Sequence, residues 1–110
     1  MPRDEGLEAQ MRDLLREVGP LAERAMFGGQ AWFLHGHLLC CARDDGALFR
    51  LGKGRDAWAL AEDGIGPMRS GGRVMSGWVR ATPEAMADDA LAERLRDAAL
   101  AFVDTLPAKR

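Results

Sequence analysis

Apolar side chains recur at helical spacing near both ends of the chain. Near the N-terminus charged residues separate them, and the apolar positions are Leu7, Met11, Leu14, Leu15 and Val18. This spacing predicts a helix over about residues 5–18, which Gly19 and Pro20 end. Near the C-terminus, Thr82 is a favourable N-cap and Pro83 a favourable first-turn residue. One long final helix is predicted after them from the apolar positions Leu91, Leu95, Ala98, Phe102 and Leu106.

Between residues 23 and 51 the pattern changes to short apolar runs separated by glycines. The separating segments are Gly28-Gly29, His35-Gly36-His37 and Asp44-Asp45-Gly46, and each can supply the positive φ of a tight turn. Four antiparallel strands follow, over 23–27, 30–35, 37–43 and 47–51. A shorter helix fits residues 54–63, with Gly64 at its end. Two further strands fit 66–70 and 72–80, joined at Gly71-Gly72.

The predicted order of elements is α-β-β-β-β-α-β-β-α, with mostly local connections. This order predicts an α+β fold, in which helices pack on one antiparallel sheet of about five to six strands. We expect one domain over residues 1–110, because domains commonly have about 100 to 150 residues. Both faces of strand 73–80 are apolar: Val74, Ser76 and Trp78 share one, and Met75, Gly77 and Val79 share the other. Such a sheet is either covered twice or offers one face to a partner.

The composition is that of an ordinary globular protein, with 47% hydrophobic and 29% charged residues and a formal charge of −2. No apolar run approaches the length of a membrane helix, and no signal peptide is expected behind Met1. Cys40 and Cys41 are adjacent and cannot form a useful cross-link, which fits a reducing compartment. We therefore expect a cytoplasmic protein without a membrane partner.

The inventory of chemical groups favours a protein that is not an enzyme. Tyr and Asn are absent, and the two histidines, His35 and His37, lie in one short segment, so a catalytic triad is not expected. With Cys40 and Cys41 these histidines form the one cluster with metal-ligand chemistry. A strand would separate His37 from Cys41 by roughly 13 Å. A polar hairpin tip followed by two small core residues is the stronger interpretation, and we expect no metal or other cofactor.

Basic residues concentrate in the predicted strand region. Residues 25–82 carry seven basic and five acidic residues, whereas residues 1–24 and 83–110 each carry four basic and six acidic residues. Arg50 is expected to share a face with Leu48, whereas Arg73 and Arg80 are expected on opposite faces of their strand. Because the whole chain is net acidic, direct binding of nucleic acid is not expected. The basic residues of this region are Arg43, Arg50, Lys53, Arg55, Arg69, Arg73 and Arg80.

Several segments, in this order, resemble the N-terminal domain of the TfoX/Sxy family. They are Arg24-Ala25-Met26-Phe27-Gly28-Gly29, Gly36 in the next turn, Leu48-Phe49-Arg50-Leu51, Met75-Ser76-Gly77-Trp78-Val79 and Leu106-Pro107. The resemblance implies an α+β fold related in shape to secretion-chaperone-like domains. Founding members of the family regulate natural competence and carry a second, helical C-terminal domain. This chain reaches only Arg110, so we expect a domain that stands alone.

The resemblance supplies no catalytic residue, but it implies roles for the motif positions. Gly28, Gly29, Gly36 and Gly77 correspond to backbone requirements, since tight turns and close strand packing exclude a side chain. Met26, Phe27 and Trp78 correspond to core or surface-patch residues. A Gly29→Val substitution is expected to destabilise the protein, because a branched side chain opposes positive φ.

These observations predict a non-enzymatic, cytoplasmic interaction or regulatory module that binds an unidentified protein partner or forms a homodimer. The candidate interaction surface comprises Arg50, Arg69, Arg73, Met75 and Trp78. One alternative is a nucleic-acid-associated transcriptional regulator that uses the basic strand region. Another is a small enzyme or metal-binding module around His35 and His37.

Overall fold

A computed structural model describes residues 4–26 and 28–107. Its strands are β1 (Ala22–Met26), β2 (Gly29–Leu34), β3 (His37–Arg43), β4 (Gly46–Arg50), β5 (Ile65–Ser70) and β6 (Arg73–Ala81). The helices of this described part are α1 (Glu5–Leu14), α2 (Ala57–Leu60), α3 (Pro83–Met86) and α4 (Asp89–Val103). The predicted α+β class and the six predicted strands are confirmed.

The strands form one antiparallel sheet in the order β1-β2-β3-β4-β6-β5. Neighbours in sequence pair as hairpins, except that β4 pairs with β6 and leaves β5 at the edge. The β2–β3 register shifts by one residue: Trp32 lies opposite Cys40, and Phe33 lies opposite Leu38. The unmatched residue is Leu39, and it turns toward the helices together with Cys40.

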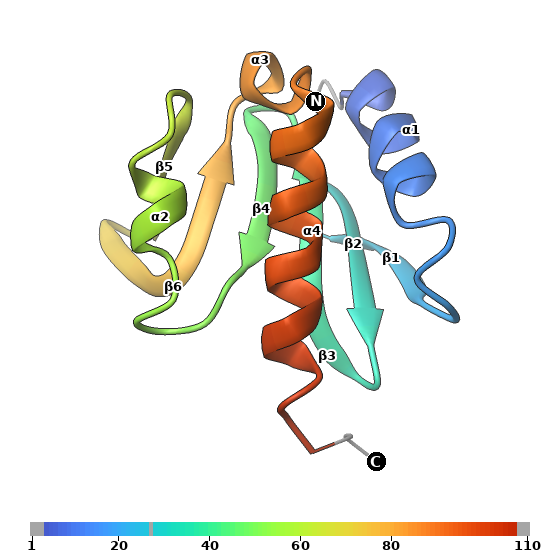
Figure 1. Cartoon of the computed structure of the whole chain (residues 1–110). Coiled ribbons are helices and arrows are strands. Elements are labelled where there is room, and N and C mark those ends of the chain that lie inside the picture. Colours follow the sequence, from blue (N-terminus) through green and yellow to red (C-terminus); the bar gives the residue numbers. More distant parts are fainter. Residues whose placement is uncertain (1–3, 27, 108–110) are drawn as a thin grey trace.

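The helices cover one face of this sheet (Figure 1), where α4 runs across β3 and β4 and α1 lies beside it. The large core of the protein fills this interface. Its most deeply buried large side chains include Met11 of α1, Phe49 of β4 and Leu95 of α4. Glu23 of β1 ties α1 to the sheet, because it accepts hydrogen bonds from Arg12 Nη2 at 2.6 Å and Trp32 Nε1 at 3.1 Å.

The opposite face carries a second, smaller apolar cluster to which strands alone contribute. Ala31, Cys41 and Leu48 form its buried centre. Around them lie the half-buried side chains of Met26, Phe33, Leu38, Met68 and Trp78. We call this side of the sheet the open face, because within the described residues no helix belongs to its cluster.

Two of the predicted helices are shorter than expected. The first was predicted to continue to residue 18 but ends at Leu14, because Arg16 and Val18 donate to carbonyls three residues back and so make tight turns. The second was predicted over 54–63 but spans only Ala57–Leu60. Gly52 and Gly54 precede it with φ of 98° and 82°, so that segment is a left-handed turn rather than a helix.

The single final helix predicted after Thr82 is two helices. Thr82 does cap the first of them, accepting a hydrogen bond from the Ala85 N–H at 3.1 Å. The chain then restarts at Asp88, whose carboxylate accepts from the Leu91 N–H at 3.2 Å and caps α4. A second capping residue, Asp88, lies inside the predicted helix and therefore divides it. In the segments 4–26 and 28–107, no helix has the length and apolar character needed to cross a membrane.

Candidate arginine hollow on the open face

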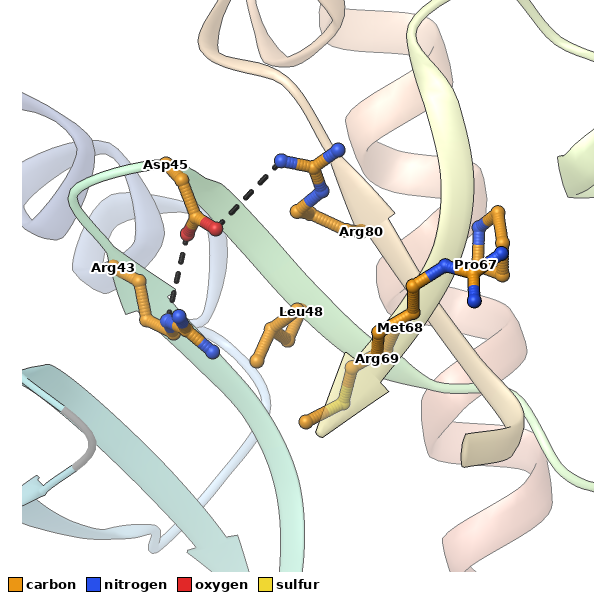
Figure 2. A pocket seen from close by; sticks show the side chains of 7 residues that line it. All are labelled: Arg43, Asp45, Leu48, Pro67, Met68, Arg69 and Arg80. Atoms are coloured by element: carbon orange, nitrogen blue, oxygen red, sulfur yellow. Dashed lines mark ion pairs between the residues drawn. The ribbon is translucent and has the colours of Figure 1, made fainter. Parts of the chain in front are cut away.

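Strand alternation places two arginines beside the apolar cluster of the open face. Arg43 follows Cys41 by two residues on β3, and Arg80 follows Trp78 by two residues on β6. The turn between β3 and β4 then brings Asp45 between them. The Arg43 Nε lies 3.4 Å from Asp45 Oδ1, and the Arg80 Nη1 lies 3.6 Å from Asp45 Oδ2 (Figure 2). One carboxylate thus faces two guanidinium groups from separate strands.

These three side chains line a hollow of about 340 Å³ at the centre of the β3–β4–β6–β5 region. Leu48 lies at its base and is 1% exposed. We call this cavity the arginine hollow. Its full lining is Arg43, Asp45, Leu48, Pro67, Met68, Arg69 and Arg80. Arg43 and Arg80 face Asp45 over an apolar floor, whereas the Arg69 guanidinium points away from Asp45 (Figure 2).

The ion pairs of the arginine hollow, at 3.4 and 3.6 Å, are longer than the pair between Arg12 and Glu23. Arg12 and Glu23 meet through three contacts of 2.6 to 3.1 Å, the geometry of a bidentate charged hydrogen bond. Arg43 instead has an inward-facing, buried Nε that makes no hydrogen bond within the described residues. Arg69 forms no ion pair with any described residue. The guanidinium groups therefore retain unused hydrogen-bonding capacity.

The thiols near the arginine hollow are poor nucleophiles. Burial raises the pKa of Cys41 to about 12, and the Arg43 charge offsets part of that rise. Burial also raises the pKa of Cys40 well above its ordinary value, with a further increase from Cys41. Both thiols are protonated near neutral pH, whereas the thiolate is the reactive form. Cys40 belongs to the helix-covered core and Cys41 to the open face, as strand alternation predicted.

The structure separates the residues predicted as an interaction surface into three places. Trp78 lies in the open-face cluster, and Arg69 lines the arginine hollow. Arg73 and Met75 lie on the part of β6 that extends past β4 and pairs with β5 alone. Arg50 was expected on the face of Leu48. Its pairing with Trp78 confirms this placement, and its guanidinium reaches 5.5 Å from the ring centroid of Phe102 on α4.

The glycine motif near the first hairpin serves two different needs. Gly28 and Gly36 have φ of 76° and 83°, which confirms the left-handed turns predicted there. Gly29 does not have a left-handed φ, so the predicted reason for its importance was wrong. A Cβ at Gly29 would overlap the carbonyl oxygen of Ala42, because the backbones of β2 and β3 approach closely there. Met26 is half-buried at the rim of the open-face cluster, and Phe27 lies outside the described residues.

Gly77 fixes how β6 meets the end of β4. Its φ is 86°, and its carbonyl oxygen accepts hydrogen bonds from the N–H groups of Leu51 at 2.7 Å and Gly52 at 3.0 Å. A Cβ at this position would lie 2.5 Å from the backbone nitrogen of Lys53. The glycine of the Met-Ser-Gly-Trp-Val segment is therefore a backbone requirement that positions Trp78 on the open face.

The histidine segment forms a hairpin turn. His35 is exposed in the β2–β3 turn with φ of 54°. His37 is buried, and its Nε2 lies 2.5 Å from the carbonyl oxygen of Pro107, so it fixes the segment that follows α4. Among residues 4–26 and 28–107, no three His, Cys, Asp or Glu side chains gather as metal ligands.

Sequence reasoning missed the members of the arginine hollow other than Arg69. Arg43 and Arg80 were counted among the basic residues but not placed on the candidate surface. Their spacing of two residues from Cys41 and Trp78 was the available signal, because strand residues two apart share a face. Asp45 carried no comparable signal, since its position depends on the pairing of β4 with β6.

Comparison with known protein families matches the chain to the TfoX N-terminal domain over residues 13–103. The match begins near the end of α1, reaches the end of α4 and includes every residue of the arginine hollow. The chain therefore belongs to the TfoX N-terminal domain family. Searches of curated proteins and of solved structures found no match to it.

Proposed function

For this TfoX N-terminal domain, we propose a non-enzymatic, cytoplasmic regulatory module that acts by binding another protein. The observation that carries the proposal is the open face, where an apolar cluster made by strands alone adjoins the arginine hollow. Trp78 and Phe33 are half-buried on this face, and aromatic side chains with arginines are the residues most enriched at protein interfaces. This combination supports a protein partner.

The state of the reactive side chains supports a binding role over an enzymatic one. The two thiols are protonated near neutral pH, and the His37 ring is engaged with the Pro107 carbonyl. A nucleophile needs an adjacent base to be activated, and these groups make no such pair with each other. Binding through preformed surfaces requires none of this chemistry.

A homodimer is a second form of the same proposal. The observation that favours it is the β5–β6 hairpin, where Val74 is 51% exposed and Met75 is 39% exposed beyond the end of β4. A contact through the open face would bring the arginines of two copies together in a two-fold dimer. A homodimer is therefore expected to use the hairpin and to leave the open face available.

The experiment compares partner capture by three forms of the folded protein: wild type, Trp78→Ala and Trp58→Ala. Both tryptophans are half-buried, but Trp58 packs against the helix-covered core, with the Arg94 guanidinium 4.4 Å from its ring centroid. We expect one stoichiometric partner with wild type and Trp58→Ala, and its loss with Trp78→Ala. Equal capture by all three would refute the assignment of the open face.

Binding of nucleic acid is the alternative outcome, and the arginines of the open face are the observation that favours it. Its signature is a steep fall of affinity with salt, because bound cations displace counterions from phosphates. A partner removed from the complex by nuclease treatment would establish this alternative in place of a protein partner.

A further inference from the structure

We propose that the arginine hollow binds a carboxylate of the partner protein, an aspartate or glutamate side chain next to an apolar residue. This inference rests on the proposed function and specifies which group of the partner the open face recognises. It follows from three features of the hollow: its unsaturated guanidinium groups, its apolar floor and its charge balance.

The guanidinium groups of Arg43 and Arg80 lie close to the Asp45 carboxylate, but this carboxylate does not use all of their hydrogen-bond donors. Asp45 reaches Arg43 and Arg80 through contacts of 3.4 and 3.6 Å, and the buried Arg43 Nε makes no hydrogen bond to any residue that the structure describes. Hydrogen bonds between charged groups shorten to about 2.7–2.9 Å when they are fully formed. A second carboxylate in the hollow would gain such bonds from Arg43 and Arg80, whose side chains are 30% and 42% exposed.

The apolar floor of the hollow favours a partner in which an apolar residue lies next to the acidic one. Leu48 lies at the base, and Met68 and Pro67 of β5 line the side toward the sheet edge. A volume of about 340 Å³ is at the lower end of the range for small-molecule sites, so it suits one or two side chains. An acidic residue beside an apolar residue matches both parts of the lining.

The charge balance favours a carboxylate over a phosphate chain. The lining holds three arginines and one aspartate, an excess of two positive charges, whereas the whole chain carries −2. Binding along a nucleic acid requires several cations that follow successive phosphates. Here Arg43 and Arg80 instead converge on one cavity around Asp45, a geometry that suits a single carboxylate rather than a row of phosphates.

The test is a nuclear magnetic resonance titration that follows the arginine Nε–H signals of the intact protein. The probe is the capped peptide Leu-Glu-Leu, and its matched control is the capped peptide Leu-Gln-Leu, which has the same shape without the charge. We expect saturable shifts of Arg43 and Arg80 with the glutamate peptide and binding about tenfold weaker with the glutamine peptide. R80Q should remove the difference. R55Q should retain it, because Arg55 lies near Phe102 outside the hollow.

Equal binding of the two peptides, or an unchanged preference in R80Q, would overturn the proposal. Hexanoate that binds as tightly as the glutamate peptide would assign the hollow to free small acids instead. A short oligothymidylate that binds the same arginines more tightly would assign it to nucleic acid. If wild type captures a partner that depends on Trp78 but does not bind the glutamate peptide, the carboxylate assignment alone would be overturned. Peptide binding without any such partner would instead overturn the proposed function.

Discussion

The two faces of the sheet bury apolar side chains in different ways. Phe49 and Leu48 are neighbours on β4, and both are almost fully buried, at 0% and 1% exposure. Phe49 is buried by a second layer, the helices α1 and α4, whereas Leu48 is buried by side chains from neighbouring strands. Burial without a covering layer leaves the outer surfaces of those neighbours accessible. The open face can therefore be stable by itself and still bind a partner.

Substitution of Phe49 and of Leu48 by alanine measures how much each face of the sheet contributes to the free energy of unfolding. Phe49→Ala should lower the free energy of unfolding by about 3–5 kcal/mol, since it opens a cavity within two packed layers. Leu48→Ala should cost about 2 kcal/mol, near the lower limit for such changes, because the surrounding strand side chains can relax toward solvent. Chemical denaturation of both variants checks this order. A greater loss from Leu48→Ala would show that the open face is the principal core.

Close backbone approach at the start of β2 gives the next largest effect. Gly29→Val should cost about 1–3 kcal/mol, because the new Cβ overlaps the carbonyl oxygen of Ala42. Gly28→Ala is the control: its φ is left-handed, but a Cβ there meets no atom within 4 Å, so its cost should be about 1 kcal/mol. Thermal melting of both variants ranks them. A larger loss of stability from Gly28→Ala than from Gly29→Val would show that the left-handed φ of the turn is the main requirement of this motif.

Alkaline pH should weaken the protein through its thiols. The pKa of Cys41 is about 12 in the folded protein, whereas that of an unfolded cysteine is about 8.5. Folded protein therefore binds more protons between these values, and stability falls as the pH rises through that window. Urea denaturation at several pH values should show this fall, and Cys41→Ala should make it shallower. An equal slope in wild type and Cys41→Ala would contradict the burial of this thiol on the open face.

The smallest change in stability is expected at the arginine hollow. Arg80→Gln removes a half-exposed, long ion pair with Asp45, so the free energy of unfolding should change by about 0.5 kcal/mol or less. The preference for the glutamate peptide over the glutamine peptide should nevertheless be lost. Denaturation and titration of the same sample separate the two effects. A large loss of stability would mean that the arginine holds the fold together and does not serve recognition.

Local patterns were sufficient to predict the sheet but not the site. Glycine turns and short apolar runs defined all six strands, because hairpin pairing depends on neighbouring segments. Helix ends were less predictable: Asp88 falls inside the single helix predicted after Thr82, but its carboxylate caps α4. The arginine hollow joins β3, β4, β5 and β6, and its geometry depends on the crossover that pairs β4 with β6. The contact of the Arg50 guanidinium with Phe102 shows the same limit, since it joins a strand to a helix distant in sequence.

The most direct test of the open face as the binding surface is site-specific photo-crosslinking in living cells. The photoreactive residue p-benzoylphenylalanine replaces Met68 on the open face or, as the matched control, Leu60 on α2, which is 39% exposed. We predict a covalent adduct with one protein from position 68 and none with that protein from position 60. An adduct formed from position 60 alone would contradict the account, because it would place the partner on the helical side.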